Sequence, residues 1–375
     1  MINKYKTKKN FYLYFIHFIV CIIIFFIFFS IIFIYYGPFE NIRSYIVSTA
    51  MHTNKDKFFA TWFLPKKKID DILAKTNPII LNDKENIESI KVQINNNYKA
   101  DDSNKLNADS NVNTDSGSNN FDQTTKNQIS QNQISQNNND PKTNSISTNP
   151  IEIIDISGKN YKGKLMIVKD PSKVTIGLAP KLGEVGATLS KIVQAYGAIG
   201  GINAGGFLDD NFLGTGSKPE GIVIENGKIK FIQNELNTFR IIGFNQDNIL
   251  IVSNSMTLNE IKQSNLRCAI SFGPALILNG KPLVVNGGAT IAPRSAIGQR
   301  KDGAVILLAI DGRQTDSPGA NFMDLQEILL KYGAYNAANL DGGSSTTMNF
   351  QGKTINKPCD ITGERSIASA FIIMP

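Results

Sequence analysis

The sequence predicts a mixed α/β (α+β) fold, in which a β-rich C-terminal domain has mixed sheets flanked by a few helices. One transmembrane helix and a disordered linker precede it. Three observations predict this arrangement. Charge-free apolar residues fill 11–36, Asn, Ser and Gln dominate much of 81–150, and short β-branched runs punctuated by glycine fill 151–375. Only the last segment has the composition of a globular domain.

The apolar run from Phe11 to Tyr36 contains no charged residue, and about 20 apolar residues suffice to cross a bilayer as a helix. The tail 1–10 before it is basic, so the positive-inside bias predicts a cytoplasmic N-terminus and an extracytoplasmic C-terminal bulk. We expect a single-pass signal anchor in the cell membrane. A cleaved signal peptide is the alternative; Ser48 and Ala50 suit a cleavage site, but the run exceeds the roughly 7 to 15 residues of a secretory core.

The formal net charge of +7 is concentrated near this anchor. Residues 1–68 hold ten basic and two acidic side chains, and the rest of the chain holds 29 basic and 30 acidic ones. Because the basic excess flanks the apolar run and no later stretch is typical of a phosphate-backbone groove, nucleic acid is excluded as a partner.

Two segments separate the anchor from the globular domain. In the juxtamembrane segment 37–80, the spacing of Ile69, Ile72 and Leu73 predicts one or two amphipathic helical turns. The segment 81–150 includes the tandem NQISQNQISQ and is too polar to bury a core. We therefore expect a flexible tether that raises the domain 151–375 from the membrane.

Within 151–375, the apolar runs predict strands, and the tetrapeptides ENGK and LNGK predict hairpins, because Asn-Gly accepts the positive φ of a tight turn. Helical spacing marks Thr188–Tyr196 and Phe322–Tyr332, each followed by a glycine. The stretch 189–203 aligns without gaps on 325–339, each giving a helix, a strand and a polar tip. Since such units place ligands beyond their strand ends, we expect the two tips to converge on one pocket.

Histidine is missing from this domain, since the chain has only His17 and His52. A Ser-His-Asp triad, a Cys-His pair and a His-ligated zinc are thereby excluded. The domain's two cysteines, Cys268 and Cys359, are too few for a four-thiolate site, and they form either two free thiols or one disulfide. Carboxylate, arginine, amide and hydroxyl chemistry remains, which is the chemistry of sugar and phosphate enzymes.

The polar residues that can supply this chemistry cluster in 292–299, 309–314 and 339–348. Arg294 follows a proline that holds its backbone rigid, and its guanidinium can bind a phosphate with two hydrogen bonds. Asp311 and Asp341 each follow an apolar strand, and Gly-Gly-Ser-Ser after Asp341 predicts an anion-binding nest of backbone N–H groups. The two aspartates can also hold a divalent cation, so a metal requirement stays open, and no other cofactor is expected.

These residues belong to an ordered set of motifs: GINAGGF, PEGIVIENGK, FGPALILNGKP, PRSAIGQ, LLAIDGRQ, NLDGGSS and a terminal strand after RSIA. As a set they resemble the phosphodiester glycosidase family. The resemblance implies cleavage of a sugar C1–O–phosphate bond, with Asp341, Asp311 and Arg294 as catalytic residues. The substrate-binding residues expected from the resemblance and from position beside these motifs are Asn203, Gly205, Phe207, Glu220, Ser295, Arg313, Gly342, Gly343, Ser344 and Ser345.

The sequence therefore predicts a membrane-anchored extracytoplasmic hydrolase that acts on sugar-1-phosphodiesters in cell-envelope or exopolysaccharide glycopolymers. Its partners would be this carbohydrate phosphodiester and, through 11–36, the membrane. The alternative is a non-catalytic module that binds wall or exopolysaccharide chains and supports polymer assembly or export. The sequence predicts neither the sugar nor the oligomeric state.

Overall fold

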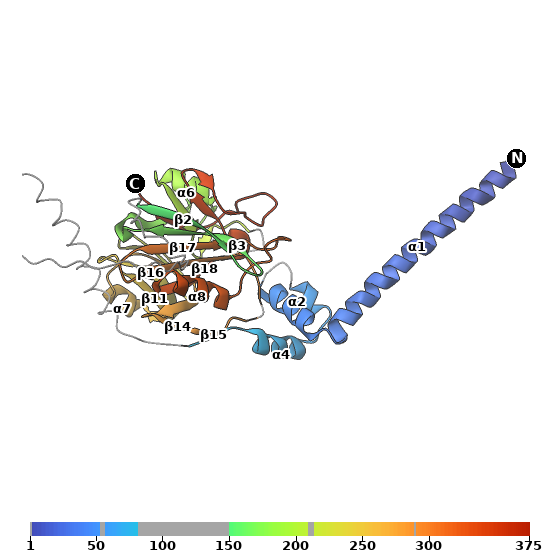
Figure 1. The fold of residues 1–375 in the computed structure, drawn as a ribbon, viewed down its shortest axis with the longest axis horizontal. Coiled ribbons are helices and arrows are strands. Elements are labelled where there is room, and N and C mark those ends of the chain that lie inside the picture. Colours follow the sequence, from blue (N-terminus) through green and yellow to red (C-terminus); the bar gives the residue numbers. More distant parts are fainter. Residues whose placement is uncertain (1, 53–56, 82–149, 209–213, 289) are drawn as a thin grey trace, which may run out of the picture.

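The computed structural model describes residues 2–52, 57–81, 150–208, 214–288 and 290–375 (Figure 1). Its helices are α1 (Ile2–Tyr36), α2 (Glu40–His52), α3 (Phe58–Thr61), α4 (Lys66–Thr76), α6 (Leu189–Ala195), α7 (Leu258–Gln263) and α8 (Phe322–Lys331), with short 3-10 turns η1 (Pro171–Lys173) and η3 (Gly343–Ser345). Within α1, the stretch Phe15–Tyr36 is long and apolar enough to cross a membrane.

A seven-stranded sheet forms the centre of the domain. Its strands, in spatial order, are β14 (Lys281–Pro282), β13 (Ala275–Leu278), β18 (Ala334–Leu340), β16 (Arg294–Arg300), β17 (Val305–Ile310), β3 (Lys162–Val168) and β2 (Ile151–Ser157). Side chains alternate between the two faces of a strand. In β17, Ile306 and Leu308 pack with Leu325 and Leu329 of α8, whereas Leu307 faces the other sheets. Both faces are buried, which explains why β17 is apolar throughout.

Two five-stranded sheets pack against the face opposite α8. One is ordered β20 (Lys353–Thr354), β19 (Met348–Phe350), β5 (Gly200–Asn203), β21 (Ser369–Ile373) and β4 (Val174–Leu178). The other is ordered β11 (Leu250–Thr257), β10 (Thr238–Asn245), β12 (Leu266–Ile270), β8 (Ile222–Glu225) and β9 (Lys228–Ile232). Two strand pairs complete the set, β1 (Ile79–Ile80) with β15 (Val284–Asn286) and β6 (Phe207–Leu208) with β7 (Lys218–Pro219).

The predicted β-rich α+β class is confirmed, with one difference in the sheets. All strand pairings in the described residues are antiparallel, whereas mixed sheets were expected. The reason is that many neighbouring strands are joined by short hairpins, and a hairpin pairs its strands antiparallel. Both predicted Asn-Gly turns are present, with positive φ at Asn226 and Gly227 between β8 and β9, and at Asn279 and Gly280 between β13 and β14.

The two helices predicted in the domain are also confirmed. The Thr188 hydroxyl caps α6, and Asn321 caps α8 through its hydrogen bonds to the backbone N–H groups of Met323 and Asp324. Glycines with positive φ, Gly197 and Gly333, follow the two helices. Helix α7 was not predicted, although Thr257 and Glu260 form a capping box that its sequence shows.

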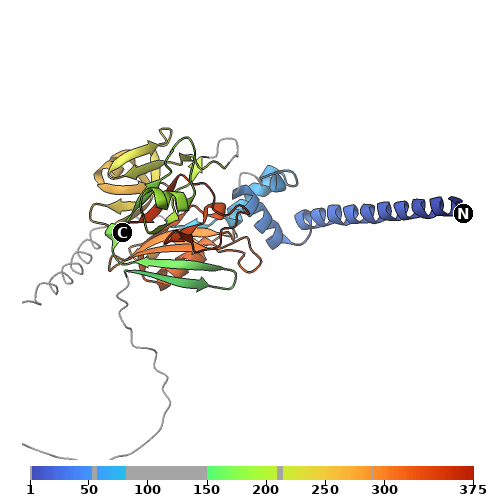
Figure 2. The ribbon, with the colours of Figure 1, turned by 90° about the horizontal axis from the view of Figure 1, so that it is seen from above.

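The juxtamembrane segment contacts the domain directly. Nearly all of the predicted linker 81–150 lies outside the described residues, but the chain already contacts the domain before it. Ile80 pairs with Val284, and the Leu81 N–H donates to the Leu283 carbonyl at 2.9 Å. Figures 1 and 2 show α2 and α4 lying between α1 and the domain. Contacts of residues 37–81 therefore place the anchor helix next to the domain.

Candidate active site

Four of the predicted site residues lie at one end of the central strands of the seven-stranded sheet, here called the sheet edge. Arg294 begins β16, where it pairs with Ile310 at the end of β17, and Ser295 pairs with Leu340 at the end of β18. Asp311 and Asp341 thus leave the sheet on either side of Arg294. Adjacent strands lie about 4.8 Å apart, so the two aspartate backbones are about 10 Å apart.

Asn203 joins the two helix-strand tips that were predicted to converge. Its amide Nδ2 donates to the Asp341 carbonyl at 2.6 Å, and its Oδ1 accepts from the Ser295 hydroxyl at 2.7 Å and from the Thr347 N–H at 3.1 Å. Both Asn203 and Ser295 are fully buried. The two side chains were predicted to bind substrate, but their bonds within the protein give them a role in positioning Asp341.

Asp341 is a half-buried carboxyl held by its own loop. It accepts hydrogen bonds from the Gly342 N–H at 3.0 Å and from the Ser345 side chain. Burial raises the pKa of Asp341 to about 6, because desolvation disfavours the charged carboxylate. The negative charge of Glu220 adds to this rise, while Ser345, Arg365 and Gly342 oppose it. Asp341 can therefore exchange a proton near neutral pH.

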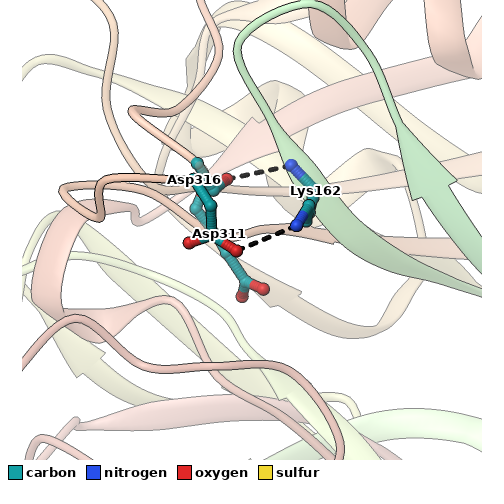
Figure 3. Close-up of polar contacts among 4 residues, drawn as sticks. Lys162, Asp311 and Asp316 are labelled. Carbon is teal, nitrogen blue, oxygen red and sulfur yellow. Dashed lines mark hydrogen bonds and ion pairs between the residues drawn. The ribbon is translucent and has the colours of Figure 1, made fainter.

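Asp311 is held differently, by a segment distant in the sequence. Its Oδ1 accepts from Asn356 Nδ2 at 3.1 Å and from the Lys357 N–H at 2.8 Å. Burial raises the pKa of Asp311, and these two hydrogen bonds oppose the rise. The neighbouring Lys162 forms its ion pair with Asp316, at 2.9 Å (Figure 3). The Asp311 carboxyl thus fastens the 356–357 segment to the sheet edge.

Arg294 is desolvated but forms no ion pair within the described part of the chain. Its Nε donates to the Ala320 carbonyl at 3.1 Å, its Nη2 donates to the Thr290 carbonyl at 3.0 Å, and its guanidinium lies 4.3 Å from the centre of the Phe322 ring. Burial and, to a lesser extent, the positive charge of Arg313 lower the pKa of Arg294 to about 10, while the negative charge of Asp324 opposes this shift. Two arginines that repel each other without a paired carboxylate form a site suited to an anion.

Arg313 supplies the second positive charge. Its backbone has a φ of 56°, in the left-handed region that non-glycine residues rarely adopt. Its Nη1 donates weakly to the Ser344 hydroxyl at 3.4 Å, and its Nη2 would lie 3.5 Å from a Cβ added at Gly343. The structure therefore brings Arg313, Gly343 and Ser344 together.

The loop 342–345 does not form the predicted anion nest. The Gly342 N–H donates to the Asp341 carboxylate, the Gly343 N–H donates to the Pro293 carbonyl at 2.9 Å, and the Ser345 N–H donates to the Gly342 carbonyl at 3.2 Å. With these groups already bonded within the protein, the loop positions Asp341. In the described structure, the arginines carry the positive charge at this edge.

Groups of opposite charge, Arg365 and Glu220, act on Asp341 from beside the first tip. The Gly205 N–H donates to the Ser369 hydroxyl at 3.2 Å, which fixes the turn after β5. The Arg365 guanidinium lies 4.8 Å from the centre of the Phe207 ring, and both Arg365 and Glu220 shift the pKa of Asp341. Glu220 is exposed. The neighbouring carboxyl that raises the pKa of Asp341 is therefore that of Glu220.

Sequence reasoning missed Arg365, Asn356 and Lys357 as site residues. A signal for Arg365 was present, since Arg365-Ser366 stands shortly before buried β21 much as Arg294-Ser295 opens buried β16. No comparable pattern marks Asn356 or Lys357, which lie in irregular backbone.

The domain contains two cysteines, one of which lies beside the loop after Asp341. Cys268 and Cys359 are both free thiols, so the alternative of a disulfide is not realised, and the Cys359 thiol lies 3.8 Å from the Ser344 hydroxyl. No three His, Cys, Asp or Glu side chains gather as a metal-binding group anywhere in the described ranges.

A shallow open depression lies elsewhere, at the Arg300 end of β16, and is lined by Arg300, Lys301, Asp302, Lys331, Tyr332 and Gly333.

Comparisons with known proteins identify proteins that this domain resembles. Residues 196–374 match the phosphodiester glycosidase family. Over 81 residues, 22% of the chain, it is 43% identical to the SPbeta prophage-derived uncharacterized protein YomE of Bacillus subtilis. Over 70 residues, 19% of the chain, it is 41% identical to N-acetylglucosamine-1-phosphodiester alpha-N-acetylglucosaminidase of Bos taurus. These alignments span only 12% and 13% of the respective relatives.

The fold has a solved counterpart as well. The zebrafish N-acetylglucosamine-1-phosphodiester alpha-N-acetylglucosaminidase catalytic domain, auto-inhibited by its pro-peptide, superposes with a TM-score of 0.51 at 23% identity, over 61% of this chain and 85% of that one. This likeness shows a shared fold. Residues 196–374 thus resemble the phosphodiester glycosidase family, and this match supports a glycosidase or hydrolase activity at the family level.

Proposed function

We propose that the protein is a membrane-anchored extracytoplasmic hydrolase that cleaves the bond between C1 of a sugar and the oxygen of a phosphodiester. The observation that carries the proposal is that one sheet edge holds two arginines, neither of which has an ion pair among the residues that the structure describes, together with the carboxyl of Asp341, whose pKa is about 6. The substrate class combines the same features, since it has an anionic phosphate next to a sugar carbon that water must attack.

The arginines fit the phosphate. A phosphodiester carries one negative charge, and the desolvated Arg294 guanidinium binds it more strongly than it would in water, because the local dielectric is lower, while the exposed Arg313 adds a second positive charge. Arg294 is held in place by two backbone carbonyls and the Phe322 ring, so it is oriented before the substrate arrives. We assign phosphate binding to Arg294 and Arg313.

Asp341 fits the attack on C1. Above a pH of about 6 it is ionised and can accept a proton from water. The water oxygen then bonds to C1 while the C1–O bond breaks, and the electron pair leaves with the phosphate monoester. This leaving group is already acidic and needs little general-acid help, which suits a domain whose sequence has no histidine.

Anchoring follows from α1. Its stretch Phe15–Tyr36 meets the length and composition of a membrane span. With the basic tail in the cytoplasm, the domain faces the extracytoplasmic side, where glycopolymers of the envelope and exopolysaccharides are the available substrates of this chemical class.

The test is to incubate the full chain in detergent with a panel of sugar-1-phosphodiesters and to measure released reducing sugar. We expect release that Asp341→Asn abolishes. Asp316→Asn, which removes only an exposed ion pair with Lys162, is the matched control and should leave the rate unchanged. Binding without release across the panel would overturn the proposal and favour the polymer-binding module.

A further inference from the structure

Residues 37–52 and 57–81 form a small packed unit, here called the collar. Its core includes the last turn of α1 through Tyr35, together with Val47 of α2, Ala60 of α3 and Ile69 of α4, all of them buried. A buried core holds these helices in one arrangement, so the collar has the construction of a rigid connector between the anchor helix and whatever it contacts.

Polar contacts fix the collar to the end of α1. The Arg43 guanidinium donates to the carbonyls of Tyr35 at 3.2 Å and Gly37 at 3.0 Å, where a helix ends with unsatisfied acceptors and partial negative charge. The Tyr35 and Tyr36 hydroxyls donate to the carbonyls of Phe59 and Phe63. The direction of α1 therefore determines the orientation of the collar.

The opposite side of the collar contacts the domain next to the candidate site. Besides the β1–β15 pairing, the Ser48 hydroxyl in α2 hydrogen-bonds the Thr290 hydroxyl, and the Thr290 carbonyl accepts from Arg294. Thr290 thus hydrogen-bonds both to the collar and to Arg294, the proposed phosphate-binding residue. Figure 2 shows the collar against the domain on the side from which α1 projects.

Helix geometry sets the scale of this separation. At 1.5 Å per residue, Ser48 lies about 12 Å along α2 from Glu40, which follows Tyr36 by only four residues. With the side chains added, Arg294 lies roughly 20 Å from the end of the span. A flexible tether of about 70 residues would instead have given a mean separation of about 45 Å. The shorter distance keeps the site within reach of the headgroup layer.

The collar's exposed side chains suit that layer too. Phe58, Phe59 and Trp62 form an aromatic cluster, and Trp62 is 77% exposed. Lys66, Lys67 and Lys68 follow Trp62 one helical turn later in the sequence. Exposed aromatic rings next to lysines at the end of a span are typical of the membrane-water interface.

We propose that the site acts on sugar-1-phosphodiesters whose second ester is to a lipid of the same membrane. This inference rests on the proposed function and specifies its substrate. Water adds to C1 and the C1–O bond breaks. The sugar leaves with a free reducing end, the phosphate monoester stays on the lipid, and the proton taken from water is released to solvent.

The test uses the full chain reconstituted in vesicles and one glycosyl phosphate in two forms, esterified either to a long-chain lipid in the bilayer or to methanol in solution. We expect kcat/KM for the lipid form to exceed that for the soluble form by tenfold or more. Ile80→Asp, which disrupts the collar's contact with β15, should reduce this ratio at least fivefold and leave soluble turnover unchanged. Ile79→Asp adds the same charge at an exposed neighbour, so it should preserve the ratio.

A ratio near one for the unmodified chain would overturn the inference while leaving the proposed function intact. An equal loss of both activities in Ile80→Asp, with the fold retained, would do the same. If Ile80→Asp does not fold, Trp62→Ala provides the comparison, and an unchanged ratio in that variant would count against the inference. Cleavage of neither form would instead overturn the proposed function itself.

Discussion

Asp311-Gly312 and Asp341-Gly342 are the same dipeptide at the ends of two strands that flank β16, yet the structure holds them differently. The Asp341 carboxyl bonds to its own loop, and the charges of Arg365 and Glu220 act on it. The Asp311 carboxyl is bonded by Asn356 and Lys357 from a distant segment. The same dipeptide therefore has two roles, because the packing around each tip differs. The Asp341 carboxyl can exchange protons, whereas the Asp311 carboxyl holds a distant segment in place.

The largest expected effect is at Asp341. Asp341→Asn removes the proton acceptor while keeping the shape of the side chain, so kcat should fall on the order of 10³-fold, within the range for loss of a general base. The released-sugar assay measures this change. Asp311→Asn under the same conditions should lose less than tenfold, and an equal loss in both variants would show that the two tips share the chemistry.

A pH profile examines the same difference without mutation. If ionised Asp341 is the base, kcat/KM falls about tenfold per pH unit below the Asp341 pKa of about 6 and is level above it. A profile that is flat from pH 4 to 8 would exclude this role for Asp341.

The next effect concerns the arginine between the tips. Arg294→Lys keeps the charge but loses the planar guanidinium and its contact with the Phe322 ring, so kcat/KM should fall about 10- to 100-fold. The control is Arg300→Lys at the other end of β16, where the side chain pairs with Asp302 at 2.6 Å. If both substitutions change turnover to the same small extent, Arg294 does not bind the phosphate.

The smallest expected effects are on stability. Burial raises the pKa of Asp311 although Asn356 and Lys357 donate to its carboxylate, so Asp311→Asn weakens two hydrogen bonds but also removes a desolvation cost, and Tm should change by no more than about 2 °C. Asp341 has a folded pKa raised above its ordinary value, so the folded state binds the proton more tightly and the wild type loses stability as pH rises towards 6.

It follows that Asp341→Asn should raise Tm at pH 8, where the wild type carries a half-buried charge, and should change it little at pH 4. Thermal unfolding of both variants at the two pH values provides the measurement. A lower Tm for Asp341→Asn at pH 8 would mean that the ionised carboxylate stabilises the fold, contrary to the raised pKa.

The sequence predicted the elements whose signals are local. Asn-Gly turns, capped helices and the apolar run of β17 need only neighbouring residues, and all three are present. The register that places Arg294 between Asp311 and Asp341 follows from strand pairing, which no local pattern specifies.

Long-range contacts explain the rest. Asn203 and Ser295 are polar residues beside the site, so they suggested substrate binding. In the structure, both are buried, and the Ser295 hydroxyl donates to the Asn203 side chain. The N–H groups of Gly342 and Gly343 are bonded to Asp341 and Pro293, which a glycine-rich pattern cannot show. The collar's contact with β15 joins residues about 200 positions apart, beyond the reach of periodicity.

Hydrolysis at the sugar carbon of a sugar-1-phosphodiester can be distinguished from hydrolysis at phosphorus by single turnover in ¹⁸O-labelled water with mass analysis of both products. Attack at C1 predicts the label on the C1 hydroxyl of the released sugar and none in the phosphate monoester. Label in the phosphate monoester would show cleavage of the P–O bond and would exclude attack at C1.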